Sequence, residues 1–315
     1  MSRVVVVGST MIEQLTYAQK LPGPGETLVG TRCAMGYGGK GANQAVMARN
    51  LGGEGAVAMV NCLGDPSVDH YAKLYKSRFE ELSINVDHIH FSAKGTMTGI
   101  APVWVEASGQ NRILVVPGAN DELMPEQAAA AVTALSAPVV VGQFEIPQAV
   151  TAAAFAAAKA RPGGATTRCV LNPAPASKID PALLAVTDWL IPNESEFELL
   201  AGSPPTDAAI AKFAAEVGVR VLVTLGADGV ALFAGGTVTR LPAPKLEKPV
   251  VDTTGAGDAF VGAFAHALAT GLDEWKAAKL GMACASSSVT REGTQTAFPD
   301  RDLCEMIAAG IASFP

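Results

Sequence analysis

The chain has few cysteines, and it lacks any long apolar run. Its five cysteines are an odd count, are widely spaced along 315 residues and form no Cys-x-x-Cys pair. This pattern argues against a disulfide framework and a zinc site, and it favours a reducing compartment such as the cytoplasm. The first apolar run, residues 4–7, is too short for a signal peptide or a membrane span, and no other run reaches membrane length.

Positive charge is also scarce. The chain holds 23 Lys and Arg against 30 Asp and Glu, which gives a net charge of −7. Nucleic acids and anionic membranes favour basic surfaces, so we expect neither as a partner. Any phosphate group must then be held by a local arrangement of residues. With 49% hydrophobic and 17% charged residues, the composition is that of a globular chain with a sizeable core.

Short apolar runs alternate with helical patterns along most of the chain. Strands are predicted at 4–7, 56–63, 138–142, 168–171, 187–191 and 219–225, and helices at 68–82, 125–136, 147–160 and 275–289. This alternation predicts an α/β fold with a doubly wound, mostly parallel central sheet and helices on both faces. We find no linker or repeat, so we expect a single domain over residues 1–315.

Two stretches depart from this alternation. Residues 27–37 mix polar and apolar residues in the manner of exposed strands. Residues 96–105 and 112–116 alternate around a turn at 107–110, which predicts a hairpin. We therefore predict a small antiparallel sheet that acts as a lid and is formed by insertions at about 11–38 and 95–117.

A glycine-rich turn leads into an apolar helix near the C-terminal end. The chain is extended at residues 250–254, passes through Gly255, Ala256 and Gly257, and then takes on helical spacing. Small residues before a helix leave the first-turn N–H groups open to an anion, which the helix dipole also favours. Asp258, in the first turn, would be an N-terminal charge partner or take a proton from a hydroxyl. A simple turn with an Asp cap is the alternative.

Glycines also surround Lys40. The stretch 36–46 enters a helix but does not meet the Gly-Lys-Ser/Thr spacing of a Walker loop. A backbone that passes close to a small polar ligand, with Asn43 as donor and acceptor, fits this stretch as well as a helix-capping turn does.

Polar residues follow several predicted strands, where a doubly wound sheet binds its ligands. Asn193 and Glu196 lie one helical turn apart, which suits either Mg²⁺ or a capping box. The turn at 226–229 would lie flat against a nucleotide or close a hairpin. The spacing does not decide between Mg²⁺ and a capping box at 193–196, or between a nucleotide contact and a hairpin at 226–229.

Five motifs in a fixed order carry a family resemblance. They are GGKGANQA at 38–45, NPAPA at 172–176, PNESE at 192–196, TLGADG at 224–229 and DTTGAGDAF at 252–260. With these motifs the sequence resembles the ribokinase branch of the PfkB sugar-kinase family over nearly the whole chain. The resemblance implies a parallel sheet with a β-lid that forms a homodimer contact, and ATP-dependent phosphorylation of the 5-hydroxyl of D-ribose.

The resemblance also implies roles for particular residues. Asp258 matches the catalytic base, and Gly255, Ala256 and Gly257 match the anion hole under the γ-phosphate. The sugar-contacting positions correspond to Met11, Glu13, Gly39, Lys40, Gly41, Asn43, Glu145 and Asp258. The ATP positions correspond to Asn193, Thr224, Gly226, Ala227, Asp228, Gly229, Gly257 and Met282. Asn193 and Glu196 match a motif that holds Mg²⁺ through water. A K⁺ site corresponds to Asp252, Thr254, Ser288, Arg291, Gly293 and Ala297.

The chain departs from the family pattern at a few of these positions. Glu13 stands where the family typically has an Asp that holds two ribose hydroxyls, and Met11 stands where bacterial relatives have Asn. Met282 replaces a common His or Asn near the adenine, and Ala297 replaces a common Ser at the potassium loop. Glu13 favours the alternative of a kinase for deoxyribose, a ketose or adenosine. A sugar or nucleotide sensor without catalysis is a further alternative, which the presence of Asp258 disfavours.

Overall fold

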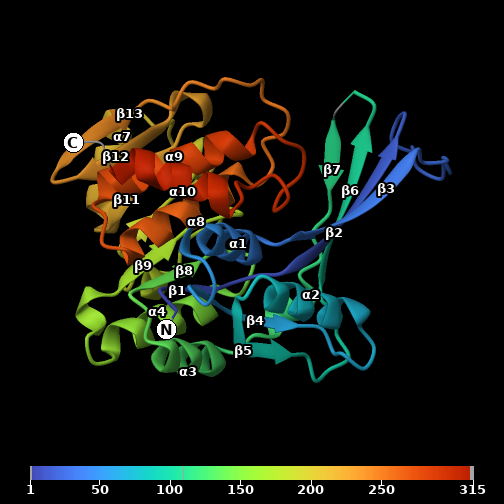
Figure 1. Cartoon of the computed structure of the whole chain (residues 1–315), viewed down its shortest axis with the longest axis horizontal. Helices are drawn as coiled ribbons and strands as arrows, with labels where there is room; N and C mark the ends of the chain where they lie inside the picture. The colour runs from blue at the N-terminus through green and yellow to red at the C-terminus, as the bar shows by residue number, and fades with distance from the viewer. Residues whose placement is uncertain (1, 109, 313–315) are drawn as a thin grey trace.

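A nine-stranded sheet forms the centre of the molecule (Figure 1), as seen in a computed structural model that describes residues 2–108 and 110–312. Its strands are β1 (Val4–Val7), β4 (Val57–Leu63), β5 (Asn85–Phe91), β8 (Val139–Gly142), β9 (Arg168–Leu171), β10 (Trp189–Leu190), β11 (Arg220–Thr224), β12 (Val230–Ala234) and β13 (Thr237–Leu241). Their spatial order is β13-β12-β11-β10-β9-β8-β1-β4-β5. All neighbours from β11 to β5 are parallel, and only the two pairings of β12 are antiparallel. The predicted fold class is confirmed.

The side chains of β1 point alternately to the two faces of this sheet, and each face has its own core. Val4 and Val6 pack in one core, and Val5 and Val7 pack in the other. All four are fully buried, which explains the continuous run of valines.

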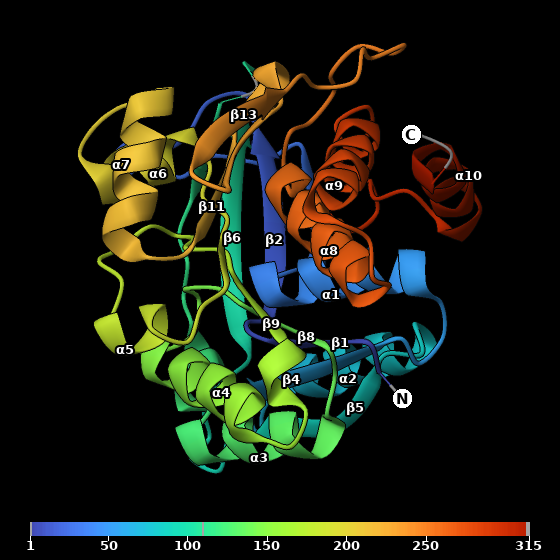
Figure 2. The same cartoon turned by 90° about the vertical axis from the view of Figure 1, so that its left-hand side faces the viewer.

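Helices cover both faces (Figure 2). The core of Val4 and Val6 includes residues of α1 (Lys40–Gly52), α2 (His70–Glu81), α8 (Ala256–Ala269), α9 (Glu274–Ser288) and α10 (Arg301–Ala312). The core of Val5 and Val7 includes residues of α3 (Pro125–Leu135), α4 (Gln148–Ala160), α5 (Pro181–Leu184), α6 (Glu194–Ala201) and α7 (Asp207–Val217). None of the helices in the described part of the chain has the length and apolar character that a membrane crossing requires.

A separate four-stranded sheet projects from the main body (Figure 1). Its strands are β2 (Met11–Ala18), β3 (Arg32–Gly38), β6 (Gly99–Glu106) and β7 (Asn111–Ile113), in the order β3-β2-β6-β7. Its outer pairs are antiparallel hairpins, whereas the central pair of β2 and β6 is parallel. The prediction of an antiparallel sheet is therefore wrong for this pair. Residues 27–31 lie outside the strands, and residue 109 of the predicted turn lies outside the described residues.

One buried side chain holds together the segments that enter and leave this small sheet. The Asn120 Oδ1 accepts the Thr10 N–H at 2.9 Å, and its Nδ2 donates to the carbonyls of Thr10 and Pro117, both at 2.8 Å. Asn120 has no exposed surface, so each of these bonds is shielded from water. The small sheet is thus anchored at a defined point of the main body.

Candidate active site

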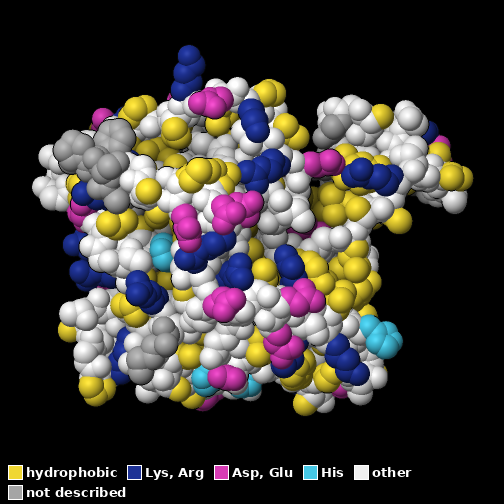
Figure 3. Space-filling view, in the orientation of Figure 1, with side chains coloured by type: hydrophobic (Ala, Val, Ile, Leu, Met, Phe, Trp, Pro, Cys, Tyr) yellow, Lys and Arg dark blue, Asp and Glu magenta, His cyan; other side chains and the backbone are white. Residues whose placement is uncertain are grey.

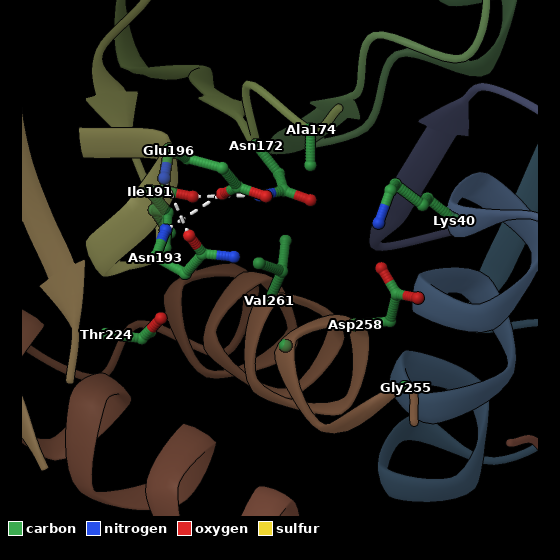
Figure 4. Close-up of a pocket in the computed structure, with 11 residues that line it drawn as sticks. Lys40, Asn172, Ala174, Ile191, Asn193, Glu196, Thr224, Gly255, Asp258 and Val261 are labelled. Carbon is green, nitrogen blue, oxygen red and sulfur yellow. Dashed lines mark hydrogen bonds between the residues drawn. The ribbon is translucent and has the colours of Figure 1, made fainter. Parts of the chain in front are cut away.

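The polar residues that follow the parallel strands meet at one edge of the main sheet. Asn172 follows β9, Asn193 follows β10, and Thr224 ends β11. Together with residues from the two glycine-rich stretches they line a cavity of about 140 Å³ (Figure 4). This is the position outside the carboxyl ends of the strands where doubly wound sheets bind ligands.

The N-terminus of α8 forms one wall of this cavity. Gly255 is the N-cap, with a left-handed φ of 76°, and a Cβ added there would lie 2.6 Å from the Thr294 methyl group. The Ala256 N–H already bonds to the Thr253 carbonyl at 3.2 Å. The next N–H groups, of Gly257 and Asp258, have no backbone acceptor in the described part of the chain, so they remain available to an anion.

Asp258 lies beside this N-terminus and is almost completely buried. Both carboxylate oxygens accept amide hydrogens from α1: Asn43 Nδ2 donates to Oδ2 and Gln44 Nε2 donates to Oδ1, each at 2.9 Å. A carboxylate has about four acceptor positions, so oxygen lone pairs remain for a ligand hydroxyl. The two amides fix the plane of the carboxylate.

Lys40, at the start of α1, points into the cavity beside Asp258 and opposite Asn193 and Glu196 (Figure 4). Burial alone would lower the pKa of the Lys40 ammonium, but the carboxylates of Asp258, Glu145 and Glu196 more than offset this and raise it. Lys40 therefore keeps its positive charge, which suits a phosphate group.

Glu145 follows β8 and faces the same start of α1. Its Oε2 accepts the Ser9 hydroxyl at 2.5 Å and the Lys40 backbone N–H at 2.8 Å. Gly41, the next residue, donates its N–H to the Ser9 Oγ at 3.3 Å. Burial, the largest cause, raises the pKa of Glu145 despite these donors.

Glu13 reaches into the site from the small sheet. It pairs with Gly36 of β3, and a Cβ added to Gly38 would lie 2.3 Å from the Glu13 Oε1. Glycine at this position therefore leaves room for the longer carboxylate side chain. Burial raises the pKa of Glu13 to about 7; the Thr294 hydroxyl, 3.4 Å from Oε2, lowers it, and the carboxylate of Asp258 adds to the rise.

The remaining predicted sugar positions surround the junction between the small sheet and α1. Met11 is buried at the start of β2 and pairs with Gly38 of β3, and Gly39 is the N-cap of α1. The structure thus brings the predicted sugar residues to one place, although they come from four separate segments.

A second and larger cavity of about 540 Å³ adjoins the first, because Thr224 and Gly257 line both. Its lining includes the predicted positions Gly226, Ala227, Gly229 and Met282. Asp228 belongs to the same short turn but does not line the cavity. The segment from Ala243 to Leu246 also lines it, although no sequence motif indicated this. The lining is mainly apolar, which suits a flat heteroaromatic ring.

Asn193 and Glu196 form the capping box at the start of α6. The Asn193 Oδ1 accepts the Glu196 N–H, and the Glu196 Oε2 accepts the Asn193 N–H, both at 2.8 Å. Both side chains also line the smaller cavity, and burial raises the pKa of Glu196. The second carboxylate oxygen of Glu196 and the nearby Asn172 are hard oxygen donors of the kind that suits a hydrated Mg²⁺ ion. No group of three or more His, Cys, Asp or Glu side chains that would hold a metal ion occurs within residues 2–108 and 110–312.

The six residues of the predicted potassium site lie in adjoining segments. Asp252 joins them, because its Oδ1 accepts the Thr254 N–H at 2.9 Å and its Oδ2 accepts the Gly293 N–H at 3.0 Å. Burial would raise the pKa of Asp252, but these N–H donors lower it. The other three are Ser288 at the end of α9, Arg291, which donates to the Phe298 carbonyl at 3.3 Å, and Ala297, which is buried.

Sequence reasoning missed two buried amides at this site. Gln44 holds Asp258, and its Oε1 accepts the Gln143 Nε2 at 2.7 Å. Gln295 donates to the Asn43 Oδ1 at 3.0 Å. Gln44 belongs to the motif at 38–45, whereas Gln295 lies outside all five motifs.

A helix N-terminus open to phosphate, a buried carboxylate beside it and an adjoining large cleft define a phosphotransferase site. Comparison with protein families matches residues 1–301 to the pfkB family of carbohydrate kinases. The chain belongs to this family, and it is a kinase.

Individual relatives agree with this placement. The chain is 35% identical to the ribokinase of Haemophilus influenzae over 306 residues, which cover 95% of each protein. It is 34% identical to the deoxyribokinase of Salmonella typhi over 303 residues, which cover 94% of this chain and 95% of the relative. Among solved structures, the Arabidopsis thaliana ribokinase complexed with ribose and ATP matches with a TM-score of 0.87, 31% identity and full coverage of both chains.

Proposed function

We propose that this protein transfers the γ-phosphoryl group of ATP to the 5-hydroxyl of D-ribose and forms D-ribose 5-phosphate. The observation that carries the proposal is the Asp258 carboxylate, which is buried, oriented by two amides and adjacent to the open N-terminus of α8. The relatives named ribokinase support ribose as the sugar, and the ribokinase complexed with ribose and ATP supports ATP as the donor.

In this proposal Asp258 takes the proton of the 5-hydroxyl while the hydroxyl oxygen attacks the γ-phosphorus in line. The transition state of phosphoryl transfer is loose, so the proton leaves late and a carboxylate suffices as the base. The segment Gly255, Ala256 and Gly257 would form the anion hole, in which the Gly257 N–H has no backbone acceptor in the described chain and the Ala256 N–H bonds to the Thr253 carbonyl. The Lys40 ammonium adds positive charge next to the transferred phosphate.

Two cations complete the proposed site. Mg²⁺ would be held through water by Asn193 and Glu196, and it would neutralise charge on the phosphates. K⁺ would bind near Asp252, which joins the segment of Thr254 to the segment of Gly293 that follows α9. The packing of Thr294 on Gly255 gives that loop a direct contact with the anion hole.

The sugar would contact Glu13, Asn43 and Glu145 in addition to Asp258. A specific observation favours deoxyribose as a second candidate substrate. Glu13 differs from the family Asp that holds two ribose hydroxyls, and a deoxyribokinase is among the relatives at 34% identity. Gly38 leaves room for the longer Glu13 side chain, whose carboxylate would contact the sugar at a different position than the shorter Asp.

The small sheet would act as the lid and as the contact of a homodimer. Five of its large apolar side chains or those next to it are exposed by 42% to 56%: Met35, Trp104, Ile113, Leu114 and Val115. Figure 3 shows hydrophobic side chains on this projecting part of the surface. The strand register places Met35, Trp104 and Leu114 on one face of the small sheet and Ile113 on the other. The three exposed apolar side chains on the first face are of the kind found at an interface between subunits. We further propose that the chain forms one kinase domain and acts in the cytoplasm.

Steady-state ATP turnover with ribose, deoxyribose, fructose and adenosine tests the choice of substrate. We expect kcat/KM to be highest for ribose. A higher value for deoxyribose would select the second candidate, and a protein that binds ribose and ATP without turnover would be a sensor.

Asp258→Asn tests the role of the carboxylate. The variant keeps the shape of the side chain but turns its NH₂ group toward one of the two amide donors. We therefore expect a lower melting temperature with nucleotide binding retained, and kcat lowered by about 10²- to 10⁴-fold. Gln148→Met, at the half-buried first residue of α4, is the control for the loss of amide hydrogen bonds away from the site. An Asp258→Asn enzyme with near wild-type kcat would remove Asp258 from the mechanism.

A further inference from the structure

A chain of buried hydrogen bonds joins the end of the small sheet to the Asp258 carboxylate. It starts at Gly38, the last residue of β3, whose carbonyl accepts the Tyr75 hydroxyl. The Tyr75 oxygen accepts the Gln295 Nε2 at 3.4 Å, and the same Nε2 donates to the Asn43 Oδ1 at 3.0 Å. The Asn43 Nδ2 then donates to the Asp258 Oδ2 at 2.9 Å. The chain therefore crosses from the small sheet to the proposed base in four bonds.

The direction of every bond in this chain is fixed. The single hydrogen of Tyr75 goes to the Gly38 carbonyl, so its oxygen can only accept from Gln295. The amide nitrogen of Gln295 therefore faces Asn43 and meets its oxygen, which turns the Asn43 NH₂ group toward Asp258. If one link breaks, the orientation of the next amide is no longer determined.

The four side chains of this chain have little contact with water. Their exposed fractions are 0% for Tyr75, 9% for Gln295, 4% for Asn43 and 6% for Asp258. Buried hydrogen bonds strengthen one another, and a buried polar group that loses its partner is destabilised. Water is poorly placed to replace a lost link, so a displacement of Gly38 affects Asn43.

Gly38 belongs to the small sheet, so its carbonyl moves when the sheet moves. It pairs with Met11 at the base of the sheet, and α1 begins two residues later with Lys40. We propose that Gln295 is a positioning residue that couples the small sheet to the base: the chain is complete, and Asp258 correctly held, when the sheet is in the position seen here. The inference rests on the role of Asp258 in the proposed function.

The other oxygen of Asp258 provides an internal comparison. Gln44 holds Oδ1 and is itself held by Gln143, which follows β8 of the main sheet. This support has no link to Tyr75 or to the small sheet. A change in Gln44 should therefore perturb the carboxylate while the chain from Gly38 to Asn43 stays intact.

A double-mutant cycle on kcat tests the coupling. Gln295→Met and Tyr75→Phe each remove one link, and we expect each to lower kcat by about 10- to 100-fold, with the KM for ATP unchanged. Because both interrupt the same chain, the double variant should have about the kcat of the slower single variant. Gln148 shares no partner with this chain, so the combination of Gln148→Met with Tyr75→Phe should have the kcat of Tyr75→Phe alone. Gln148→Met should match the wild type.

Thermal unfolding and nucleotide binding identify the folded variants. If Gln295→Met does not fold, Gln295→Glu keeps the shape and replaces the donor amide by an oxygen. A lower melting temperature with wild-type kcat, or effects of Gln295 and Tyr75 that multiply, would overturn the inference. Asp258→Asn, measured alongside, separates the two proposals: if it retains kcat the proposed base is wrong, and if only the Gln295 variants retain kcat the coupling alone is wrong.

Discussion

The ribose affinity should depend on pH near neutrality, because of Glu13. Burial, together with the carboxylates of Asp258 and Glu145, raises the pKa of Glu13 to about 7, against the lowering effect of Thr294. A sugar hydroxyl donates to the ionised carboxylate, and the protonated form offers fewer acceptor positions. With a pKa of about 7, the ionised fraction falls from roughly 0.9 at pH 8 to 0.1 at pH 6. The KM for ribose should therefore rise about 10-fold over this range.

The assay is the steady-state rate against ribose concentration at saturating ATP, from pH 6 to pH 8. Glu13→Gln keeps the size of the side chain but cannot ionise, so its KM should be high and independent of pH. A wild-type KM that is flat over this range, or a pH dependence that persists in Glu13→Gln, would refute the reasoning.

The same pKa shift predicts a change in stability. A carboxyl whose pKa is raised on folding holds a proton in the folded protein that the unfolded chain has lost. Its contribution to the free energy of unfolding is therefore present below about pH 4.5 and is lost as the pH rises to about 7. The melting temperature of the unliganded protein, plotted against pH over this window, should have a different slope for the wild type than for Glu13→Gln. Equal slopes would contradict the pKa shift.

Three further predictions concern the anion hole, the small sheet and the potassium site. Gly255→Ala places a methyl group against Thr294 at a left-handed φ, so we expect a loss of about 1–3 kcal/mol in the free energy of unfolding together with lower kcat. Gly257→Ala meets no atom within 4 Å, so its melting temperature should stay and only turnover should fall; equal melting temperatures for both would contradict this. Leu114→Lys puts a charge on the exposed apolar group and should convert a dimer to a monomer in analytical ultracentrifugation, whereas a wild-type protein that is already monomeric would exclude the interface. K⁺ should raise kcat above its value in Na⁺, and Asp252→Asn should reduce the difference; equal wild-type rates in both salts would exclude the cation site.

The main sheet was predictable because its strands are buried on both faces and consist of short β-branched runs. The strand predicted at 187–191 is shorter, since only Trp189 and Leu190 pair with both neighbours. Segments with mixed composition, such as β13 and α10, were not predicted. The parallel pairing of β2 with β6 joins residues about 90 positions apart, and local sequence patterns carry no information on such contacts.

The site shows a similar division. The glycines around residue 255 and the carboxylate that follows them were identifiable, because a helix N-terminus is encoded by adjacent residues. Gln295 was not assigned a role, because its partners Asn43 and Tyr75 come from two helices far away in the sequence. The ambiguity at Glu196 has a different origin, since the capping box engages one carboxylate oxygen and leaves the other for an ion.

The most direct test of the central claim is the identity of the product formed from ATP and ribose. Phosphorus-31 and carbon-13 NMR of a completed reaction would show where the phosphoryl group is attached. We predict phosphate on the 5-oxygen of ribose with the wild-type enzyme, and formation of the same product about 10²- to 10⁴-fold more slowly with Asp258→Asn. Phosphate at another position, or hydrolysis of ATP to ADP and free phosphate without a sugar phosphate, would contradict the account.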